Sequence, residues 1–493
     1  MNTQSISTPS PIAFAQFTDP VKAVDHLIHI FDHNAGFLQA RFKDLLAGTV
    51  PQERIRAHYP ELRLTTTSHA AIDSRLSYGH VSGPGDYSTT VTRPDLFRSY
   101  LIEQIGLLIR NYNTPVGIGT SDQPLPLHFA FPNGMNVDGA LSDFLDRPLR
   151  DVFDAPDIGN MDDAIVNGEY EATDGAPLPL APFTAPRVDY SLHRLQHYTA
   201  TQAEHFQKFV LFTNYQFYVD AFCERARKLM ADGGQGYKAF VEPGNRITHA
   251  GDKEPSEGTP LDRLPQMPAY HLKVDKHMGI TLINIGVGPS NAKTITDHVA
   301  VLRPHAWLML GHCAGLRKTQ QLGDYVLAHG YVREDHVLDA DLPNWVPIPP
   351  LAEVQVALEQ AVAEVTGYSG YELKSIMRTG TVATIDNRNW ELRDEREPVR
   401  RFSQSRAVAL DMESATIAAN GFRFRVPYGT LLCVSDKPLH GELKLPGMAS
   451  DFYRQQVNQH LDIGLLALRK MSEMPGERLH SRKLRSFSET AFQ

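Results

Sequence analysis

Two acidic residues late in the sequence have the types and the neighbours that suit chemistry on a sugar–base substrate. Glu413 follows Asp411 and Met412 at the start of a segment rich in small residues, and Asp436 follows Ser435 at the end of an apolar run. One carboxylate can accept hydrogen bonds from sugar hydroxyls, and a second, protonated carboxyl can donate a proton to a leaving base. Taken singly, each acid is more often a helix cap or a surface charge, so the interpretation depends on the pair.

A glycine-rich segment earlier in the chain is a further candidate. The run Gly286-Val287-Gly288-Pro289-Ser290-Asn291-Ala292 follows the apolar ITLINI and opens a helical segment. Glycine lets the backbone approach a ligand, and Ser290 can cap a helix whose free N–H groups attract anions. The run lacks the third glycine of the dinucleotide-binding fingerprint, so a plain glycine turn explains it equally well.

Small residues also follow the apolar run AWLML, in Gly311-His312-Cys313-Ala314-Gly315. They leave room for a ligand beside the backbone, and His312 is a candidate binding or proton-transfer group. A lone histidine is more often structural, so this segment alone leaves both interpretations open.

Composition excludes several classes of function. The 493 residues are 42% hydrophobic and 21% charged, which is typical of a globular chain with two or three domains. A net charge of −9 argues against a nucleic-acid polymer as partner, and no run of about 18 apolar residues predicts a membrane span. The three cysteines, Cys223, Cys313 and Cys433, form no disulfide or zinc pattern, and the polar N-terminus is unlike a signal peptide. We therefore expect a cytoplasmic protein without a metal site.

The clearest shift in composition lies at residues 167–187, which are rich in proline, alanine and glycine. We interpret this stretch as a linker between an N-terminal domain, residues 1–175, and a second domain, residues 176–493. The alternative is a long ordered loop that packs on one domain.

Hydrophobic periodicity predicts the elements that must position these candidates. Helices are predicted over 20–46, over 94–112 and, as one long helix, over 205–232, with strands at 62–67 and 87–91. Beyond residue 238, apolar runs alternate with helical segments; the runs are AFVE, ITLINIG, AWLMLG, YVLAHG, TVATI, AVALD and TLLCVS. They predict a sheet covered on both faces, with ligands at the carboxyl ends of its strands.

The motifs occur in the order found in the nucleoside phosphorylase and nucleosidase superfamily, which residues 240–470 resemble. The runs NIGVGPSNAKT, GHCAGLRKTQQLGDYVLAH, DNRNWELR and AVALDMESATIAA are similar to those of superfamily enzymes that hydrolyse AMP, and RPDLFRSYLIEQIGLLIRNY extends the resemblance to the N-terminal region. The resemblance implies an α/β catalytic domain with a central mixed sheet flanked by helices, plus a smaller N-terminal α/β (α+β) regulatory domain. It also implies hydrolysis of the N-glycosidic bond of AMP to adenine and ribose 5-phosphate.

The resemblance assigns roles to individual residues. Asp436 stands where the family's general acid meets N7 of the purine, and we expect burial to raise its pKa. Glu413 stands where the family holds the ribose 2′ and 3′ hydroxyls, and we expect it to be ionised. The other residues expected to contact the substrate are Gly288, Ser290, Asn291, His312, Cys313, Ala314, Arg388, Met412, Ser435 and Lys437.

Some positions depart from the family's pattern. Met309 and His312 stand where hexameric phosphorylases carry a phosphate-binding arginine and serine, which favours water as the nucleophile. A phosphate-dependent phosphorylase and a non-catalytic nucleotide sensor remain the alternatives. Arg388 stands at the position of the aromatic residue that stacks on the base, although Trp390 is nearby. Glu242, which ends the run AFVE, is a candidate to activate the water, or else a strand-end acid.

Other implications of the resemblance concern ligands and assembly. The 5′-phosphate of AMP requires cations, for which Lys437, His440 and Lys444 are candidates, with Arg388 and Arg401 as alternatives. The family implies no cofactor, ATP as allosteric activator, phosphate as inhibitor and assembly as a homohexamer.

Overall fold

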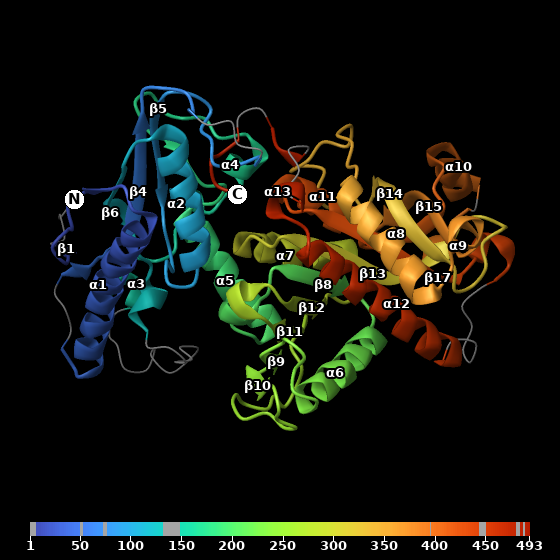
Figure 1. Cartoon of the computed structure of the whole chain (residues 1–493). Helices are drawn as coiled ribbons and strands as arrows, with labels where there is room; N and C mark the ends of the chain where they lie inside the picture. Colours follow the sequence, from blue (N-terminus) through green and yellow to red (C-terminus); the bar gives the residue numbers. More distant parts are fainter. Residues whose placement is uncertain are drawn as a thin grey trace. The chain divides into compact units, whose positions relative to one another are not determined.

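The computed structural model describes most of the chain, namely residues 6–49, 53–71, 76–131, 148–394, 396–442, 450–479, 484–486 and 489–493. The chain forms two units, one of Met1–Tyr190 with Ser486–Gln493 and one of Ser191–Arg485 (Figure 1). The helix α5 (Ala185–Thr199) carries the chain from the first unit to the second. The predicted domain boundary between residues 175 and 176 lies before the point where the units divide.

The first unit is built on one sheet with the strand order β2-β6-β4-β5-β7. Its strands are β2 (Ala15–Phe17), β4 (His58–Thr66), β5 (Gly85–Thr90), β6 (Val116–Pro124) and β7 (Leu178–Pro179), with a separate parallel pair β1 (Ile6–Ser7) and β3 (Arg54–Ile55). Its helices are α1 (Pro20–Leu46), α2 (Arg98–Tyr112), α3 (Leu149–Val152), α4 (Ala164–Asn167) and the 3-10 turns η1 (Leu127–Ala130) and η2 (Ile158–Asn160). The predicted helix over 20–46 is confirmed, because Asp19 caps its start and its apolar positions face the core.

The stretch that we interpreted as a linker is ordered within this unit, so the ordered-loop alternative holds for its second half. Strand β7 pairs in parallel with β5 at the edge of the sheet, a position that tolerates its proline. Leu180 is buried in the same core as Ala491 and Phe492 from the end of the chain. The burial of Leu180 therefore orders this part of the stretch, although the composition around Leu180 is typical of a loop.

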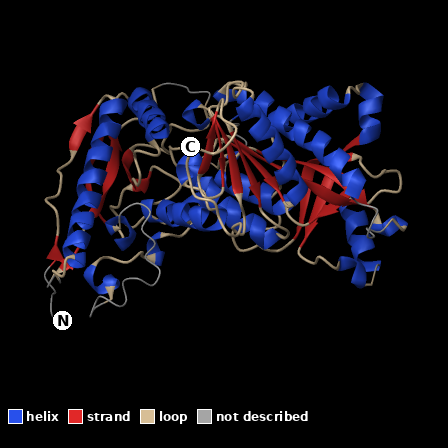
Figure 2. Cartoon of the chain, turned by 90° about the horizontal axis from the view of Figure 1, so that it is seen from below, coloured by secondary structure: helices blue, strands red, loops and turns tan. Residues whose placement is uncertain are grey.

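The second unit contains a mixed sheet with the order β10-β9-β11-β12-β8-β13-β16-β15-β14-β17. An additional pairing of β17 with β13 closes β13, β16, β15, β14 and β17 into a ring. Strands β12, β8, β13 and β17 run parallel, so their carboxyl ends meet at one edge. Helices flank these strands in Figure 2, which confirms the predicted fold class.

Each of the seven apolar runs predicted as strands beyond residue 238 contains a strand, and the described sheet also includes strands over residues 209–213, 246–249 and 269–273 that were not predicted. The strands are β8 (Phe209–Thr213), β9 (Ala239–Glu242), β10 (Arg246–His249), β11 (Ala269–Lys273), β12 (Ile280–Asn284), β13 (Ala306–Gly315), β14 (Tyr325–Glu334), β15 (Met377–Ile385), β16 (Ala409–Asp411) and β17 (Tyr428–Asp436). The helices are α6 (Gln216–Ala231), α7 (Pro289–Val299), α8 (Ala352–Thr366), α9 (Gly370–Ile376), α10 (Arg396–Ser405), α11 (Ser414–Phe424), α12 (Ser450–Ser472) and α13 (Gly476–Leu479). Single 3-10 turns are η3 (Ala203–His205), η4 (Asp275–His277), η5 (Ala300–Leu302), η6 (Trp390–Leu392) and η7 (Pro438–His440).

One local prediction in this unit was wrong. The single helix over 205–232 is replaced by β8, a turn and α6, because the run FVLFT lies buried between β12 and β13. A short continuous apolar run does not distinguish a helix from a fully buried strand. Residues 311–315, whose small side chains we expected to leave room for a ligand, form the second half of β13, which pairs there with β17 and β16.

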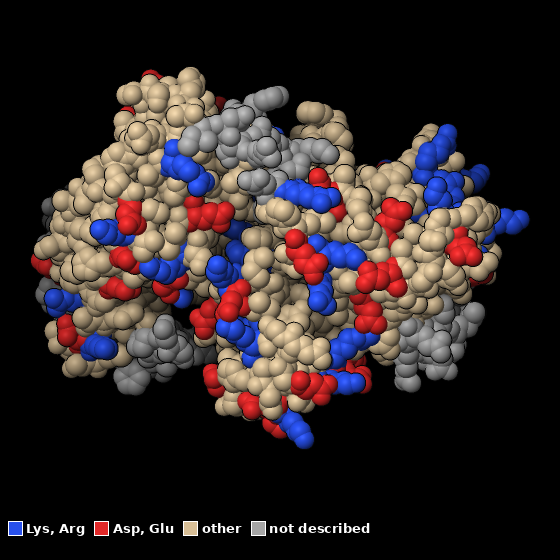
Figure 3. Space-filling model, in the orientation of Figure 1, with Lys and Arg blue, Asp and Glu red and all other residues tan. Residues whose placement is uncertain are grey.

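The surface mixes charges of both signs. On the face drawn in Figure 3, Lys and Arg side chains are interspersed with Asp and Glu. Within the described residues, no helix is long and apolar enough to span a bilayer.

Gly421 offers a test of the packing of α11. A Cβ at Gly421 would lie 2.4 Å from Cδ1 of Tyr428, whose ring is fully buried. Alanine in a helix interior gains about 1 kcal/mol over glycine, whereas overpacking costs about 1–3 kcal/mol. We expect Gly421→Ala to lower the thermal unfolding midpoint, while Gly36→Ala, in an open position of α1, holds or raises it. An unfolding midpoint of Gly421→Ala at or above that of the wild type would contradict this packing.

Candidate active site

The start of α11 is capped by residues other than Glu413. The N–H of Ser414 donates to Oδ2 of Asp411 at 2.9 Å, and the N–H of Ala415 donates to Oγ1 of Thr384 at 2.9 Å. Thr384 in turn donates its hydroxyl to Oδ1 of Asp411 at 2.6 Å. Because Asp411 and Thr384 satisfy the first free N–H groups of the helix, the side chain of Glu413 is available for another partner.

The carboxylate of Glu413 is held from two sides. It is 1% exposed, and its Oε1 accepts a hydrogen bond of 2.6 Å from the N–H of Gly288. Its Oε2 accepts a hydrogen bond of 2.8 Å from Nδ2 of Asn214. The backbone of Met412 also donates to this carboxylate. A carboxylate can accept about four hydrogen bonds, so acceptor capacity remains for a ligand hydroxyl.

The glycine loop reaches Glu413 through a backbone conformation that favours glycine. Gly288 has φ 117° and occupies the N-cap position of α7, so its N–H can point toward Glu413. The prediction that Ser290 caps this helix was wrong, because Ser290 already lies inside α7 and is exposed. Two asparagines hold the loop: Asn284 accepts from the N–H of Gly286 at 3.1 Å, and Asn291 donates to Val287 O at 3.3 Å.

Strand β13 places Asp436 near the Glu413 site. Asp436 ends β17 as a half-buried residue, accepts a hydrogen bond of 2.6 Å from Ser435, and pairs with Ala314 of β13. Farther back on β13, a Cβ at Gly311 would lie 3.3 Å from Oδ1 of Asn214, the residue that binds Glu413. Gly311 and Ala314 are about 10 Å apart along a strand, a spacing that one nucleoside can bridge.

Electrostatics connect the acids of this site. Burial, followed by the nearby Asp411 carboxyl, raises the pKa of Glu413, while the hydrogen bonds from Gly288 and Asn214 act to lower it. Burial also raises the pKa of Asp411, against the hydrogen bonds from Ser414 and Thr384. Burial raises the pKa of the Cys313 thiol, and Cys433, Asp411 and Asp436 raise it further, which places Cys313 near both acids. Burial and Asp411 outweigh the hydrogen bonds to Glu413, so the pKa of Glu413 is raised on balance, which is opposite to our expectation of an ionised group; the ionised form depends on the donors that the carboxylate keeps.

Asn214 belongs to this site although the sequence did not indicate it. It follows the last residue of β8, so the predicted helix over 205–232 would have placed it in a helix interior. A fully apolar strand followed by a polar residue at the carboxyl edge of the sheet is the signal that would have identified it.

Glu242 lies apart from the contacts of Glu413. It is buried at the end of β9, which is separated from β16 by β11, β12, β8 and β13. Its Oε1 forms an ion pair of 2.5 Å with the guanidinium of Arg227 on α6. Its role in activating water stays a prediction.

The candidate cations differ in what they contact. Lys437 is buried, donates to Gln320 O at 2.9 Å and forms an ion pair of 2.7 Å with Glu442. Arg388 and His440 are exposed, and His440 Nε2 lies 3.3 Å from Leu316 O. Arg401 forms an ion pair with Glu334, and Lys444 lies outside the described residues.

The remaining candidates have the following contacts. His312 lies on β13 with its ring 5.3 Å from that of Tyr215, and Met412 is half-buried beside Glu413 in sequence. Ser435 lies 3.3 Å from Cys313 O, which joins β17 to β13. Trp390 packs edge-on against Phe402 at 6.1 Å.

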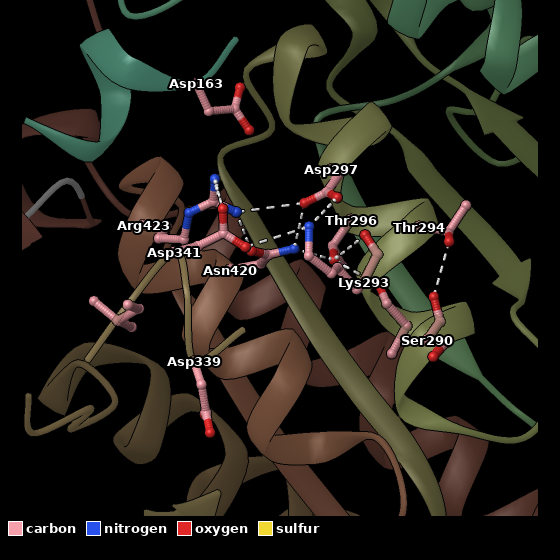
Figure 4. Close-up of polar contacts among 12 residues, drawn as sticks. Asp163, Ser290, Lys293, Thr294, Thr296, Asp297, Asp339, Asp341, Asn420 and Arg423 are labelled. Atoms are coloured by element: carbon pink, nitrogen blue, oxygen red, sulfur yellow. Dashed lines mark hydrogen bonds and ion pairs between the residues drawn. The ribbon is translucent and has the colours of Figure 1, made fainter. Parts of the chain in front are cut away.

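A polar network joins α7 and α11, the two helices that begin at Gly288 and Glu413 (Figure 4). Nδ2 of Asn420 donates to Oγ1 of Thr296 and to Oδ1 of Asp297, both at 2.8 Å. Its Oδ1 accepts a hydrogen bond of 2.8 Å from Arg423, whose side chain is 2% exposed. The network fixes the two helices to each other and so supports the contact between Gly288 and Glu413.

Comparison with known proteins places the whole chain beside enzymes of nucleotide cleavage. Residues 22–177 match the family described as the N-terminus of bacterial AMP nucleoside phosphorylase, and residues 244–467 match the phosphorylase superfamily. The AMP nucleosidase of Escherichia coli strain K12 is 47% identical over 483 residues, which cover 96% of this chain and 98% of that protein. The AMP nucleosidase of Escherichia coli O157:H7 matches to the same extent.

Solved structures give weaker similarities. The crystal structure of AMP nucleosidase from Bacteroides thetaiotaomicron is 28% identical with a TM-score of 0.42, and the match covers 58% of this chain and 98% of that chain. Purine nucleoside phosphorylase from Toxoplasma gondii, in complex with immucillin-H, is 17% identical with a TM-score of 0.41, covering 55% and 94%.

The network of Figure 4 predicts a stability difference between two substitutions. Asn420→Ala leaves buried groups of Thr296, Asp297 and Arg423 without their amide partner, which costs about 1–3 kcal/mol. Lys293→Met removes a more exposed ion pair with Asp297 and costs less than about 1 kcal/mol. Chemical denaturation of both variants measures the difference, and equal stability of the two would contradict the proposed importance of the buried network.

Proposed function

This chain belongs to the AMP nucleosidase family and hydrolyses the N-glycosidic bond of AMP, and we propose that Glu413 and Asp436 carry this reaction. The observation that carries the assignment is the buried Glu413 carboxylate, held by Gly288 and Asn214 and linked through β13 to Asp436. The products are adenine and ribose 5-phosphate.

Asp436 is the general acid in this proposal. Cleavage leaves an electron-rich purine, and a proton delivered near N7 makes the purine a better leaving group. The hydrogen bond from Ser435 orients the Asp436 carboxyl, and its pairing with β13 fixes the backbone that carries it.

Glu413 binds the ribose and stabilises the cation-like sugar. The acceptor capacity left on its oxygens suits the neighbouring 2′ and 3′ hydroxyls, and its negative charge offsets the positive charge that develops on the sugar. Met412, which precedes Glu413, packs under the sugar ring in this proposal, and Arg388 contacts the base.

Water is the nucleophile in this proposal, and cationic side chains hold the 5′-phosphate. Met309 is fully buried on β13 beside Gly311, where an apolar side chain provides no charge for a phosphate co-substrate. Lys437, the nearest cation in sequence to Asp436, must exchange its contact with Glu442 in order to reach a phosphate.

We further propose that the enzyme works as a cytoplasmic homohexamer, activated by ATP and inhibited by phosphate, without a metal or organic cofactor. The family resemblance supports the effectors and the oligomer, with the N-terminal unit as the regulatory part. The three free, buried cysteines fit a reducing compartment.

Asp436→Asn tests the acid. The amide keeps the shape but cannot deliver the proton, so turnover of AMP should fall about 10²–10⁴-fold, while calorimetry still detects AMP binding. Asp462→Asn, which removes an exposed acid paired with Arg225, is the matched control and should keep full turnover. Unchanged turnover of Asp436→Asn would remove this residue from its role.

The nature of the sugar product tests the reaction class. Incubation with AMP should release adenine and ribose 5-phosphate whether or not phosphate is present, and ATP should raise the rate while phosphate lowers it. Mass spectrometry of the products checks this expectation. Ribose 1,5-bisphosphate that forms only with phosphate would establish a phosphorylase instead, and rates indifferent to ATP and phosphate would contradict the proposed effectors.

A further inference from the structure

We propose that Asn214 is a positioning residue for this reaction: its side-chain amide holds one oxygen of Glu413 so that the carboxylate presents its remaining acceptor sites to the ribose hydroxyls. The proposal deepens the function proposed above and rests on the role given there to Glu413. Asn214 does not itself touch the reacting atoms in this account.

The chemistry of the pair fixes the orientation of the amide. A carboxylate only accepts hydrogen bonds, so the nitrogen Nδ2 must face Glu413, as it does at 2.8 Å. The amide oxygen then faces β13, where Gly311 provides the room: a Cβ there would lie 3.3 Å from Oδ1 of Asn214. The amide is thus confined between a strand and the carboxylate, and it has little freedom to turn away.

The backbone around Asn214 is fixed by the sheet. Thr213 ends β8 in register with Asn284, the residue that holds the glycine loop. Asn284 also donates to the side chain of Gln216 at 3.2 Å, which joins the turn after β8 to the end of β12. Two of the donors to Glu413, Asn214 and Gly288, therefore come from neighbouring strand ends that are joined by these hydrogen bonds.

The two donors act on opposite oxygens. Gly288 binds Oε1 and Asn214 binds Oε2, so the plane of the carboxylate is set by both together. Loss of the backbone donor cannot be tested by a side-chain change, whereas loss of the Asn214 donor can. Removal of Asn214 should leave Glu413 free to rotate and less able to remain ionised, because burial and Asp411 both favour its protonated form.

The charges around Glu413 define the expected pH effect. Asp411 on β16 is the carboxyl that acts on it, and Asn214 and Gly288 are neutral. The adjoining strands contribute His312 and Cys313 on β13 and Asp436 on β17. Without the Asn214 donor, the acid-side decline of kcat/KM should move to higher pH.

The experiment compares kcat/KM for AMP across pH in wild type, Asn214→Ala and Asn214→Asp. In both variants the acid-side midpoint should rise by about one pH unit or more, because a hydrogen bond to a charged group is lost. Asn214→Asp should shift it further, because it places a second carboxyl against Glu413. The activity should recover at alkaline pH, which a general loss of structure would not allow.

Three further variants serve as an alternative and as controls for this experiment. The Cβ of Gly311→Ala would lie 2.9 Å from the flexible end of Met309 and 3.3 Å from the Asn214 amide oxygen. By crowding this amide, the variant should shift the midpoint in the same direction if the Asn214 variants fold poorly. Asn458→Ala, which changes an exposed asparagine bound by Arg225, should keep the wild-type profile. In a Glu413→Gln background, Asn214→Ala should cause little further loss, since the partner of the amide is already changed.

Two outcomes separate this inference from the proposed function. If Glu413→Gln is inactive but the Asn214 and Gly311 variants keep the wild-type acid-side midpoint, the inference fails and the role of Glu413 stands. If Glu413→Gln is as active as the wild type, both fail together.

Discussion

The burial of two carboxyl groups within three residues, Asp411 and Glu413, is the constraint on which the active site depends. A buried charge without partners costs several kcal/mol, so the fold must bring hydrogen-bond donors to both groups. The donors come from separate parts of the chain: Thr384 on β15 and Ser414 on α11 serve Asp411, whereas Gly288 after β12 and Asn214 after β8 serve Glu413. The strand order of the second unit brings these donors to the two carboxyl groups.

The two carboxyl groups have different partners, and this difference leaves Glu413 available to a substrate in the proposed mechanism. Asp411 is used inside the protein, since it caps α11 and binds Thr384. Glu413 accepts from Gly288, Asn214 and the backbone of Met412, and its carboxylate can still accept from a ligand. The helices α7 and α11, joined through Asn420 and Arg423, carry Gly288 and Glu413 as one rigid pair. In the proposed mechanism, pre-organisation of this kind lets the carboxylate stabilise charge on the sugar without first rearranging.

The sequence predicted where strands end more accurately than it predicted which residues contact one another at those ends. Glu413 and Asp436 could be proposed from the sequence because acids at element boundaries and the family's motif order pointed to the same residues.

Asn214 could not be proposed from the sequence. The apolar run FVLFT before it has no periodicity that separates a buried strand from a helix, and only the pairing of this run with β12 and β13 shows that it is a strand. The prediction that Ser290 caps α7 was wrong because Gly288 occupies the N-cap position with a positive φ. A pattern of side chains does not reveal this backbone conformation. The prediction of a linker was wrong for the second half of residues 167–187, because a composition typical of loops does not reveal that Leu180 is buried.

The most direct test of the account is a crystal structure of the Asp436→Asn variant with AMP bound. The account predicts that both ribose hydroxyls lie within hydrogen-bond distance of the Glu413 carboxylate, and that N7 of the adenine faces the side chain at position 436. A nucleotide bound with its ribose away from Glu413, or with its base out of reach of position 436, would contradict it.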